Sequence, residues 1–245
     1  MTRLLVRLAI AGLVSLSLAQ VFAADPVGAV KETIVAGPDD VTLKVRMEGP
    51  YTADVPLQVV CYFQYSDALA KKMTGAPVEL DKHLGGVIAA LRERGEFQGE
   101  ELETILIRTP EGSIKAKALL LVGLGREESL SVETMERVGR IALREASRLG
   151  AAKVAFAPLL RDQGNSKLAT GDVETAVVRG MLLAYDTERR LQKEGLASEY
   201  ILKEWWVEAG PAYFEETVGG VRKGVTEATG AMKGRSAAPY GHAKQ

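Results

Sequence analysis

Two glycine pairs have the spacing that most suggests binding chemistry. Gly123-x-Gly125 follows an apolar run and precedes a helical segment. A strand–glycine–helix turn of this kind presents backbone N–H groups to a phosphate. The third glycine of a dinucleotide fingerprint is missing, because position 128 is Glu128, and Glu127 beside it would also repel an anion. We therefore favour a simple tight turn over a ligand contact at this pair.

The second pair, Gly85-Gly86, lies at the start of a helical pattern. Glycine within a helix costs about 1 kcal/mol relative to alanine, so two in succession need a reason. They predict the close approach of another part of the molecule or of a ligand, and we favour packing. Gly85, Gly86, Gly123 and Gly125 are the candidate ligand-binding residues.

Motifs for a metal site or a nucleophile are absent from the sequence. It contains no Cys-x-x-Cys, His-Glu-x-x-His or Gly-x-Ser-x-Gly. Its two histidines, His83 and His242, leave few ligands for zinc, and we interpret His83 as an exposed turn residue. We therefore expect no catalytic residue and no metal ligand in this chain.

Cys61 and the pair Trp205-Trp206 are better explained by packing. Cys61 lies in a strand-like apolar run, which predicts a buried, inert thiol. Neighbouring residues on a strand point to opposite faces, so one tryptophan can lie in the core while the other covers a helix or a partner. We favour core packing on both faces.

The elements that position these residues alternate between strands and helices. A hairpin over 103–122, with its turn at Pro110-Glu111-Gly112, interrupts the alternation. The pattern predicts a three-layer α/β/α fold with a mixed, mostly parallel sheet. The predicted strands are 41–47, 55–65, 103–109, 115–122, 153–158 and 200–207; the predicted helices are one capped by Asp81 and ended by Gly95, then 131–149, 172–190 and 211–232.

Composition excludes several classes of protein. The 245 residues carry 31 Lys and Arg against 32 Asp and Glu, a net charge of -1. This balance argues against a general nucleic-acid binder, which needs a concentrated basic face. An apolar content of 47% is that of a packed globular protein and excludes a disordered chain.

The first 24 residues have the pattern of a secretory signal peptide. Arg3 and Arg7 precede an apolar run, and small residues such as Ala23 follow it. The run is short for a membrane span, which needs about 20 apolar residues. We expect residues 1–24 to be a cleaved signal peptide that leaves no stable membrane anchor and makes the protein periplasmic or secreted. Residues 25–40 are expected to be a lead-in segment, 41–232 one α/β domain, and 233–245 a flexible tail.

Several segments between Leu80 and Tyr185 occur in a characteristic order and spacing, and Leu121-Val122-Gly123-Leu124-Gly125 is the most specific of them. They resemble the N-terminal domain of the leucyl (cytosol) aminopeptidase family. The other segments are 80–86, 95–99, 103–106, 109–112 and 180–186.

The resemblance implies a macro-domain-like fold. In that family, catalysis belongs to a C-terminal domain that binds two divalent metals through a lysine and several acidic residues. Its signature, Asn-Thr-Asp-Ala-Glu-Gly-Arg, does not occur in these 245 residues, so no family metal or catalytic residue is carried over and no cofactor is expected in this chain. The family's N-terminal domain contributes to hexamer assembly, and macro domains bind ADP-ribose-like ligands through glycine loops.

We therefore expect an exported, non-catalytic binding or assembly module. The alternatives are a macro-type binder of a nucleotide or ADP-ribose-like ligand, and a regulatory or split partner of a metal-dependent aminopeptidase. The corresponding partners are a second copy of the chain, an aminopeptidase subunit or a small ligand, and no nucleic acid.

Overall fold

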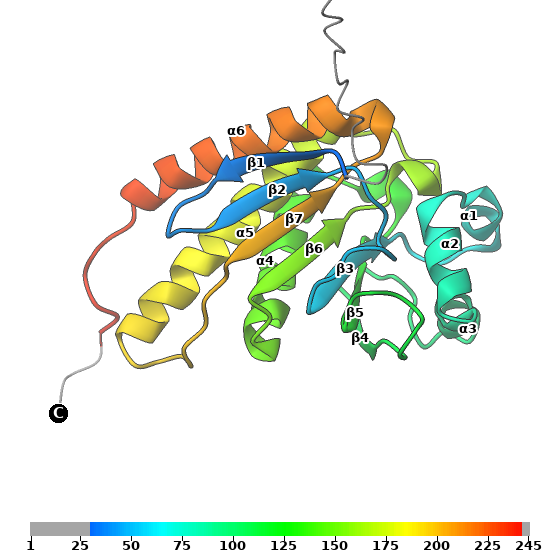
Figure 1. Cartoon of the computed structure of the whole chain (residues 1–245), viewed down its shortest axis with the longest axis horizontal. Coiled ribbons are helices and arrows are strands. Elements are labelled where there is room, and N and C mark those ends of the chain that lie inside the picture. Colours follow the sequence, from blue (N-terminus) through cyan, green and yellow to red (C-terminus); the bar gives the residue numbers. More distant parts are fainter. Residues whose placement is uncertain (1–29, 242–245) are drawn as a thin grey trace, which may run out of the picture.

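The centre of the molecule is a twisted seven-stranded sheet with the strand order β1-β2-β7-β6-β3-β5-β4. The computed structural model describes residues 30–241. The strands are β1 Glu32–Ala36, β2 Thr42–Arg46, β3 Leu57–Tyr62, β4 Thr104–Arg108, β5 Ala118–Gly123, β6 Lys153–Ala157 and β7 Glu204–Glu208 (Figure 1).

The five inner strands run parallel, and the two edge strands run against them. β1 pairs antiparallel with β2, and β4 pairs antiparallel with β5, as the hairpin predicts. The pairs β2–β7, β7–β6, β6–β3 and β3–β5 are parallel. The expectation of a mixed, mostly parallel sheet is confirmed. Because the five inner strands are parallel, their carboxyl ends lie along the same edge of the sheet.

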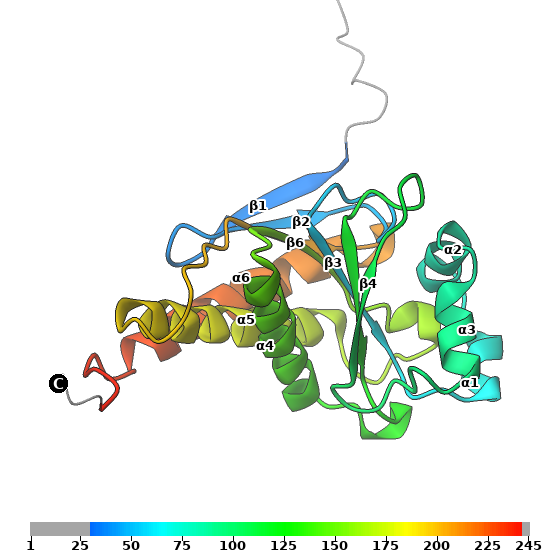
Figure 2. The same cartoon turned by 90° about the horizontal axis from the view of Figure 1, so that it is seen from below.

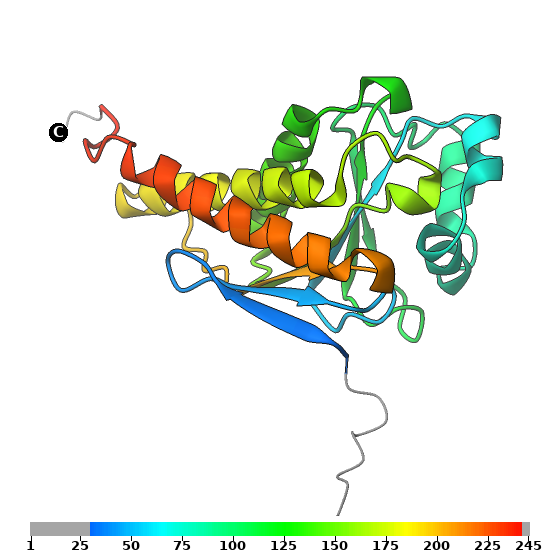
Figure 3. The same ribbon diagram turned by 90° about the horizontal axis from the view of Figure 1, so that it is seen from above.

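Helices cover both faces of the sheet. Three long helices cover one face, where α5 and α6 lie side by side and α4 crosses α5, and a group of short helices lies beyond β3 and β5 on the other (Figures 2 and 3). The long helices are α4 Val132–Leu149, α5 Thr170–Lys193 and α6 Phe214–Lys233; the short ones are α1 Asp67–Lys72, α2 Ala76–His83 and α3 Val87–Glu93, with single 3₁₀ turns η1 Glu127–Ser129, η2 Arg161–Gln163 and η3 Pro211–Tyr213.

Side chains that alternate along β3 supply both halves of the core. Val59 and Cys61 face the cluster under α4, α5 and α6, whereas Val60 and Tyr62 face the cluster under α2 and α3. Cys61 is a fully buried free thiol, and burial raises its pKa far above the ordinary value, so the expectation of an inert core cysteine is confirmed.

Three local expectations are confirmed. Trp205 and Trp206 are both buried and belong to different core clusters. His83 is exposed and stacks on the ring of Tyr51, with the ring centroids 4.8 Å apart. Asp81 caps α3, because its Oδ1 accepts a hydrogen bond from the backbone N–H of Ile88 at 2.8 Å.

The structure corrects three other expectations. Strand β1 lies within residues 25–40, where the sequence suggested a loose lead-in. Helices α1 and α2 were not predicted. The strand expected over 200–207 begins at Glu204, where pairing with β2 and β6 starts, and Tyr200 lies before it with its side chain donating a hydrogen bond to the carbonyl of Ala151.

The predicted signal peptide and His242 lie outside the described residues, so both stay predictions. None of the helices within residues 30–241 combines the length and the apolar character that a membrane span requires.

Candidate functional site

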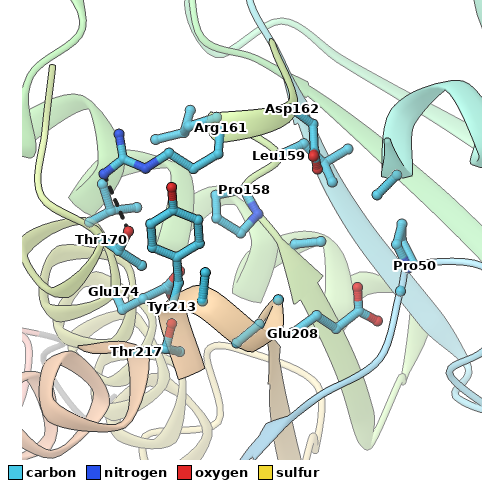
Figure 4. Close-up of a pocket in the computed structure, with 18 of the residues that line it drawn as sticks. Pro50, Pro158, Leu159, Arg161, Asp162, Thr170, Glu174, Glu208, Tyr213 and Thr217 are labelled. Atoms are coloured by element: carbon cyan, nitrogen blue, oxygen red, sulfur yellow. Dashed lines mark hydrogen bonds between the residues drawn. The ribbon is translucent and has the colours of Figure 1, made fainter. Parts of the chain in front are cut away.

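A pocket of about 360 Å³ lies beyond the carboxyl ends of β2, β6 and β7. Its walls come from the segments that follow these strands, residues 48–50, 157–162 and 208–213, together with the first turns of α5 and α6 (Figure 4). Open α/β sheets bind their ligands in the crevice outside the carboxyl ends of parallel strands. The size and the position of the pocket therefore make it the candidate ligand site of the described residues.

Much of the wall is apolar. Pro50, Pro158, Leu159 and Pro211 line it, and the ring of Tyr213 stands at one side (Figure 4). Leu159 has a φ of 55°, a left-handed conformation that is unusual for a residue with a branched side chain. Strained backbone of this kind tends to gather at binding sites, where the surrounding structure holds it in place.

Glu208 is the last residue of β7 and is buried. Its Oε2 accepts a hydrogen bond from Gln58 Nε2 at 3.3 Å, while its Oε1 has no hydrogen-bond partner. Burial raises the pKa of Glu208 well above the ordinary value. The nearby Glu48 raises it further, and Gln58 and Arg46 oppose the change. Oε1 of Glu208 is thus buried in this pocket without a hydrogen bond that would offset its loss of contact with water.

Glu174 lies in the first turns of α5, with 1% of the residue exposed. Its Oε2 is buried and has no hydrogen-bond partner. Burial alone raises its pKa to about 8 from the ordinary 4.5. A carboxyl group held in this way is protonated near neutral pH and becomes charged only when a partner offsets the cost of burial.

Two further carboxyl groups line the pocket. Glu48 follows β2, and burial raises its pKa against the opposing influence of Arg46, whose Nε lies 3.1 Å from Glu48 Oε1. Asp162 belongs to η2, and burial raises its pKa against a hydrogen bond from the backbone of Ala76. All four acidic residues of the wall are thus shifted toward the neutral form.

The arginine of the wall is already engaged with its own loop. Arg161 donates to the carbonyls of Asn165 at 2.9 Å and Leu168 at 2.7 Å, and to Thr170 Oγ1 at 3.3 Å (Figure 4). Its guanidinium carbon lies 5.4 Å from the ring centroid of Tyr213. The site therefore presents acidic acceptors to a ligand, while its arginine orders the loop that carries Leu159.

The four glycines proposed from the sequence do not line this pocket. Gly85 and Gly86 lie between α2 and α3 with φ of 68° and 83°, and a Cβ at either would meet nothing within 4 Å. The expected close packing at this pair is therefore wrong. The reason for glycine there is the left-handed backbone that turns one helix into the next. Ligand contact at this pair stays a prediction.

Gly123 and Gly125 are packed against their own chain. A Cβ at Gly123 would lie 1.9 Å from the carbonyl oxygen of Glu100, and Gly125, with a φ of 71°, faces the Cβ of Glu101. The segment before β4 thus occupies the space beside this turn, in agreement with the tight-turn interpretation. Ligand contact here also stays a prediction.

Glu174 and Glu208 do not belong to any motif that the sequence predicted. Glu208 directly follows the apolar run Trp205–Val207, at the point where a parallel strand ends. Glu174 adjoins the apolar stripe of α5 that contains Val173 and Val177. An acidic residue at either position is the signal that the sequence offers. For Glu208 this signal points to a site, because parallel strands end at a common edge of the sheet.

The N-terminal domain of the cytosol aminopeptidase family matches residues 59–194, which is more than half of the chain. The chain belongs to the cytosol aminopeptidase family. The matched range runs from within β3 to the end of α5 and includes Glu174, whereas Glu208 lies beyond it.

Curated relatives in the cytosol aminopeptidase family are much longer than this chain. A probable cytosol aminopeptidase of Alkaliphilus oremlandii is 33% identical over 131 residues, which is 51% of this chain and 26% of that protein. One of Thermosynechococcus vestitus is 29% identical over 138 residues, 56% of this chain and 26% of that protein. The matched part thus spans about a quarter of these relatives. Among the described residues, no group of three or more His, Cys, Asp or Glu is arranged to hold a metal ion.

Solved structures share the fold of this family member. A tomato leucine aminopeptidase variant is similar with a TM-score of 0.53 and 18% identity, over 79% of this chain and 38% of the tomato chain. The Oceanobacillus iheyensis macrodomain with ADP is similar with a TM-score of 0.54 and 10% identity, over 81% of this chain and 99% of that chain. The expectation of a macro-domain-like fold is therefore confirmed.

Proposed function

We propose that this chain is an exported, non-catalytic module of the cytosol aminopeptidase family that binds a small organic ligand in the pocket beyond β2, β6 and β7. The observation that carries the proposal is the pair of unpartnered carboxylate oxygens, Glu174 Oε2 and Glu208 Oε1, in an otherwise largely apolar wall. Buried polar atoms in native proteins nearly always have a partner, so two orphans in one pocket point to a ligand.

The acidic wall separates this proposal from the nucleotide-binding alternative. ADP accompanies the Oceanobacillus iheyensis macrodomain in its structure, and the shared fold brings ADP-ribose-like ligands into consideration. A diphosphate placed beside Glu48, Glu174 and Glu208 would disfavour the ionised form of these carboxyl groups, and the arginine of the wall is already bound to oxygen atoms of its own loop. Electrostatic complementarity therefore favours a ligand without negative charge.

Amide chemical-shift mapping on the purified chain tests the proposal. The probes are ADP-ribose, cyclohexylmethanol and cyclohexylmethylamine. Saturable shifts of the backbone amides of residues 157–162 and 208–213 with at least one probe are expected, and ADP-ribose should be the weakest. If none of the probes shifts these amides at millimolar concentration, the chain does not act through this pocket.

The non-catalytic part of the proposal is supported by the missing metal-binding signature in these 245 residues. Hydrolysis of leucine anilide by the purified chain should stay at background with added manganese or zinc. Turnover that depends on metal and disappears with a chelator would contradict this part.

Export is supported by the basic and apolar pattern of residues 1–24. Expression in a Gram-negative host should give a periplasmic product that has lost about this many residues, as measured by intact-mass spectrometry. A cytoplasmic product of full mass would contradict export.

Assembly is a second candidate function, and the edges of the sheet favour it. Ile34 on β1 is 62% exposed and Leu106 on β4 is 43% exposed, so both edge strands carry apolar side chains into solvent. Unprotected edge strands are templates for pairing with another chain. Light scattering after size exclusion should show an oligomer, and co-purification from the native host should show an aminopeptidase subunit if that is the partner.

A further inference from the structure

Among residues 30–241, the wall of this pocket offers carboxyl oxygens but no cation that is free to pair with them. Glu174 and Glu208 each keep an unpartnered buried oxygen there. The arginine of the wall, Arg161, is bound to three oxygen atoms of its own loop. A positively charged ligand would therefore meet no competing cation beside these carboxyl groups once they ionise.

Groups around the two glutamates do not neutralise them. Arg46 lies 3.1 Å from both Glu32 and Glu48, and its guanidinium stacks 4.0 Å from the ring centroid of Trp206. Gln58 gives Glu208 one neutral hydrogen bond. Asp162, on the far wall in Figure 4, adds another carboxyl group.

We infer that the ligand is an apolar primary amine whose ammonium group pairs with the buried carboxylate of Glu174, while its hydrocarbon part lies against the prolines and leucines of the wall. The inference rests on the proposed function, since it names the chemical class of ligand for that pocket. An ammonium group offers three donors and one positive charge, which matches the orphaned oxygen of Glu174 and the negative charge of its ionised form. A charge-assisted hydrogen bond is also about twice as strong as a neutral one.

The energetics of the carboxyl groups give the inference a distinct signature. Burial raises the pKa of Glu174 to about 8, so this group carries a proton in the free protein at neutral pH. An ammonium group beside it favours the ionised form and lowers that pKa. Binding of the amine should therefore release protons, whereas binding of an uncharged ligand of the same shape should not.

Three probes of nearly equal shape separate the possibilities. They are cyclohexylmethylamine, cyclohexylmethanol and cyclohexanecarboxylate, titrated into the purified chain by calorimetry and by amide shift mapping. The amine should bind about tenfold more tightly than the alcohol, and the carboxylate should bind more weakly than either. Heats measured in phosphate and in Tris at about pH 7 should differ for the amine because protons are released.

Isosteric variants locate the contact. Glu174→Gln keeps the side-chain shape and should weaken amine binding by about tenfold, with little effect on the alcohol, whereas Glu208→Gln, which leaves Glu174 intact, should weaken it less. Glu227→Gln, at an exposed position on α6, is the matched control and should bind like the parent chain. Circular dichroism confirms that each variant is folded, and the buffer comparison on the parent chain needs no variant.

The outcomes distinguish a failure of this inference from a failure of the proposed function on which it rests. If the alcohol or the carboxylate binds at the pocket as tightly as the amine, the ligand class is wrong and the binding function stands. If the heats are equal in both buffers and Glu174→Gln does not affect the amine, the amine binds elsewhere and the inference is overturned. If none of the probes reaches the pocket, the proposed function fails as well.

Discussion

Gly180 of α5 lies so close to α4 that a Cβ on it would be 2.0 Å from the carbonyl oxygen of Glu136. The contact is reciprocal, because a Cβ on Gly139 of α4 would be 2.1 Å from the carbonyl oxygen of Val177. The two helices thus cross backbone to backbone, and this crossing fixes the course of α5, which carries Glu174 into the pocket.

Gly180→Ala should lower the free energy of unfolding by about 1–3 kcal/mol, because the helices must move apart to admit the methyl group. Urea denaturation measures the change. Gly219→Ala on α6 is the matched control, since nothing lies within 4 Å of a Cβ there, and it should stabilise the chain by up to about 1 kcal/mol. Equal urea midpoints for both variants would show that the crossing of α4 and α5 can admit a methyl group at Gly180.

Glu174 should make the chain less stable as pH rises through neutrality. Burial raises its pKa in the folded state from 4.5 to about 8. Between these values the folded chain holds a proton that the unfolded chain has released, so the free energy of unfolding falls with rising pH. Burial shifts the pKa of Glu208 in the same direction.

Glu174→Gln cannot titrate, so its stability relative to the parent chain should grow by at most about 1.4 kcal/mol for each pH unit in this window. Urea midpoints measured from about pH 5 to pH 8 give the two curves, and Glu227→Gln should run parallel to the parent chain. Curves for the parent chain and Glu174→Gln that stay parallel would show that Glu174 is solvated.

Much of the fold could be predicted because its strands and helices are strongly patterned. The apolar run around Cys61 predicts a strand buried on both faces, and the adjacent Trp205 and Trp206 are found in the two separate core clusters. Strand β1 could not be predicted from pattern, because its five residues are alternately exposed and half-buried and its place depends on pairing with β2.

The candidate site was less predictable than the fold. Glycine spacing pointed to Gly123 and Gly125, but whether such a turn is open or filled depends on a distant segment, here Gly99 to Glu101. Burial of Glu174 is likewise a tertiary effect, since the charge on a helix becomes costly only when neighbouring elements exclude water from it. The composition and periodicity of the sequence carry little information about whether a glycine turn is filled or whether a glutamate on a helix is buried.

Glu204 should affect how the free energy of unfolding changes with pH under acidic conditions. Burial opposes its charge, but hydrogen bonds from Trp206 Nε1 at 2.7 Å and from Lys44 and Lys153 lower its pKa to about 2. A lowered pKa contributes stability above the unfolded value of 4.5, and this stability is lost as pH falls through about 2.

Glu204→Gln should therefore cost about 1 kcal/mol at neutral pH, a figure reduced for solvent screening, and almost nothing near pH 2. Thermal unfolding at the two pH values measures the difference. Glu79→Gln removes the exposed pair with Lys82 and should change stability by less than about 0.5 kcal/mol at either pH. A cost for Glu204→Gln that is unchanged at low pH would mean that packing, rather than charge, explains the effect.

Gln163 joins the end of β3 to the loop that forms the pocket wall. It is fully buried, and its Oε1 accepts a hydrogen bond from Phe63 N at 3.0 Å. Its Nε2 donates to the carbonyls of Cys61 at 3.0 Å and Leu159 at 3.1 Å. The last of these bonds holds Leu159 in its left-handed conformation beside the ligand site.

Gln163→Leu preserves the approximate volume but leaves three buried backbone groups without partners. It should lower the free energy of unfolding by about 2–4 kcal/mol and broaden the amide signals of residues 158–163, because the strained Leu159 loses its restraint. Ser166→Ala, at an exposed position in the same loop, should change stability by less than about 0.5 kcal/mol. An unchanged urea midpoint for Gln163→Leu would mean that water replaces the lost hydrogen bonds, and the pocket wall would then have to be held by Arg161 and its three oxygen partners alone.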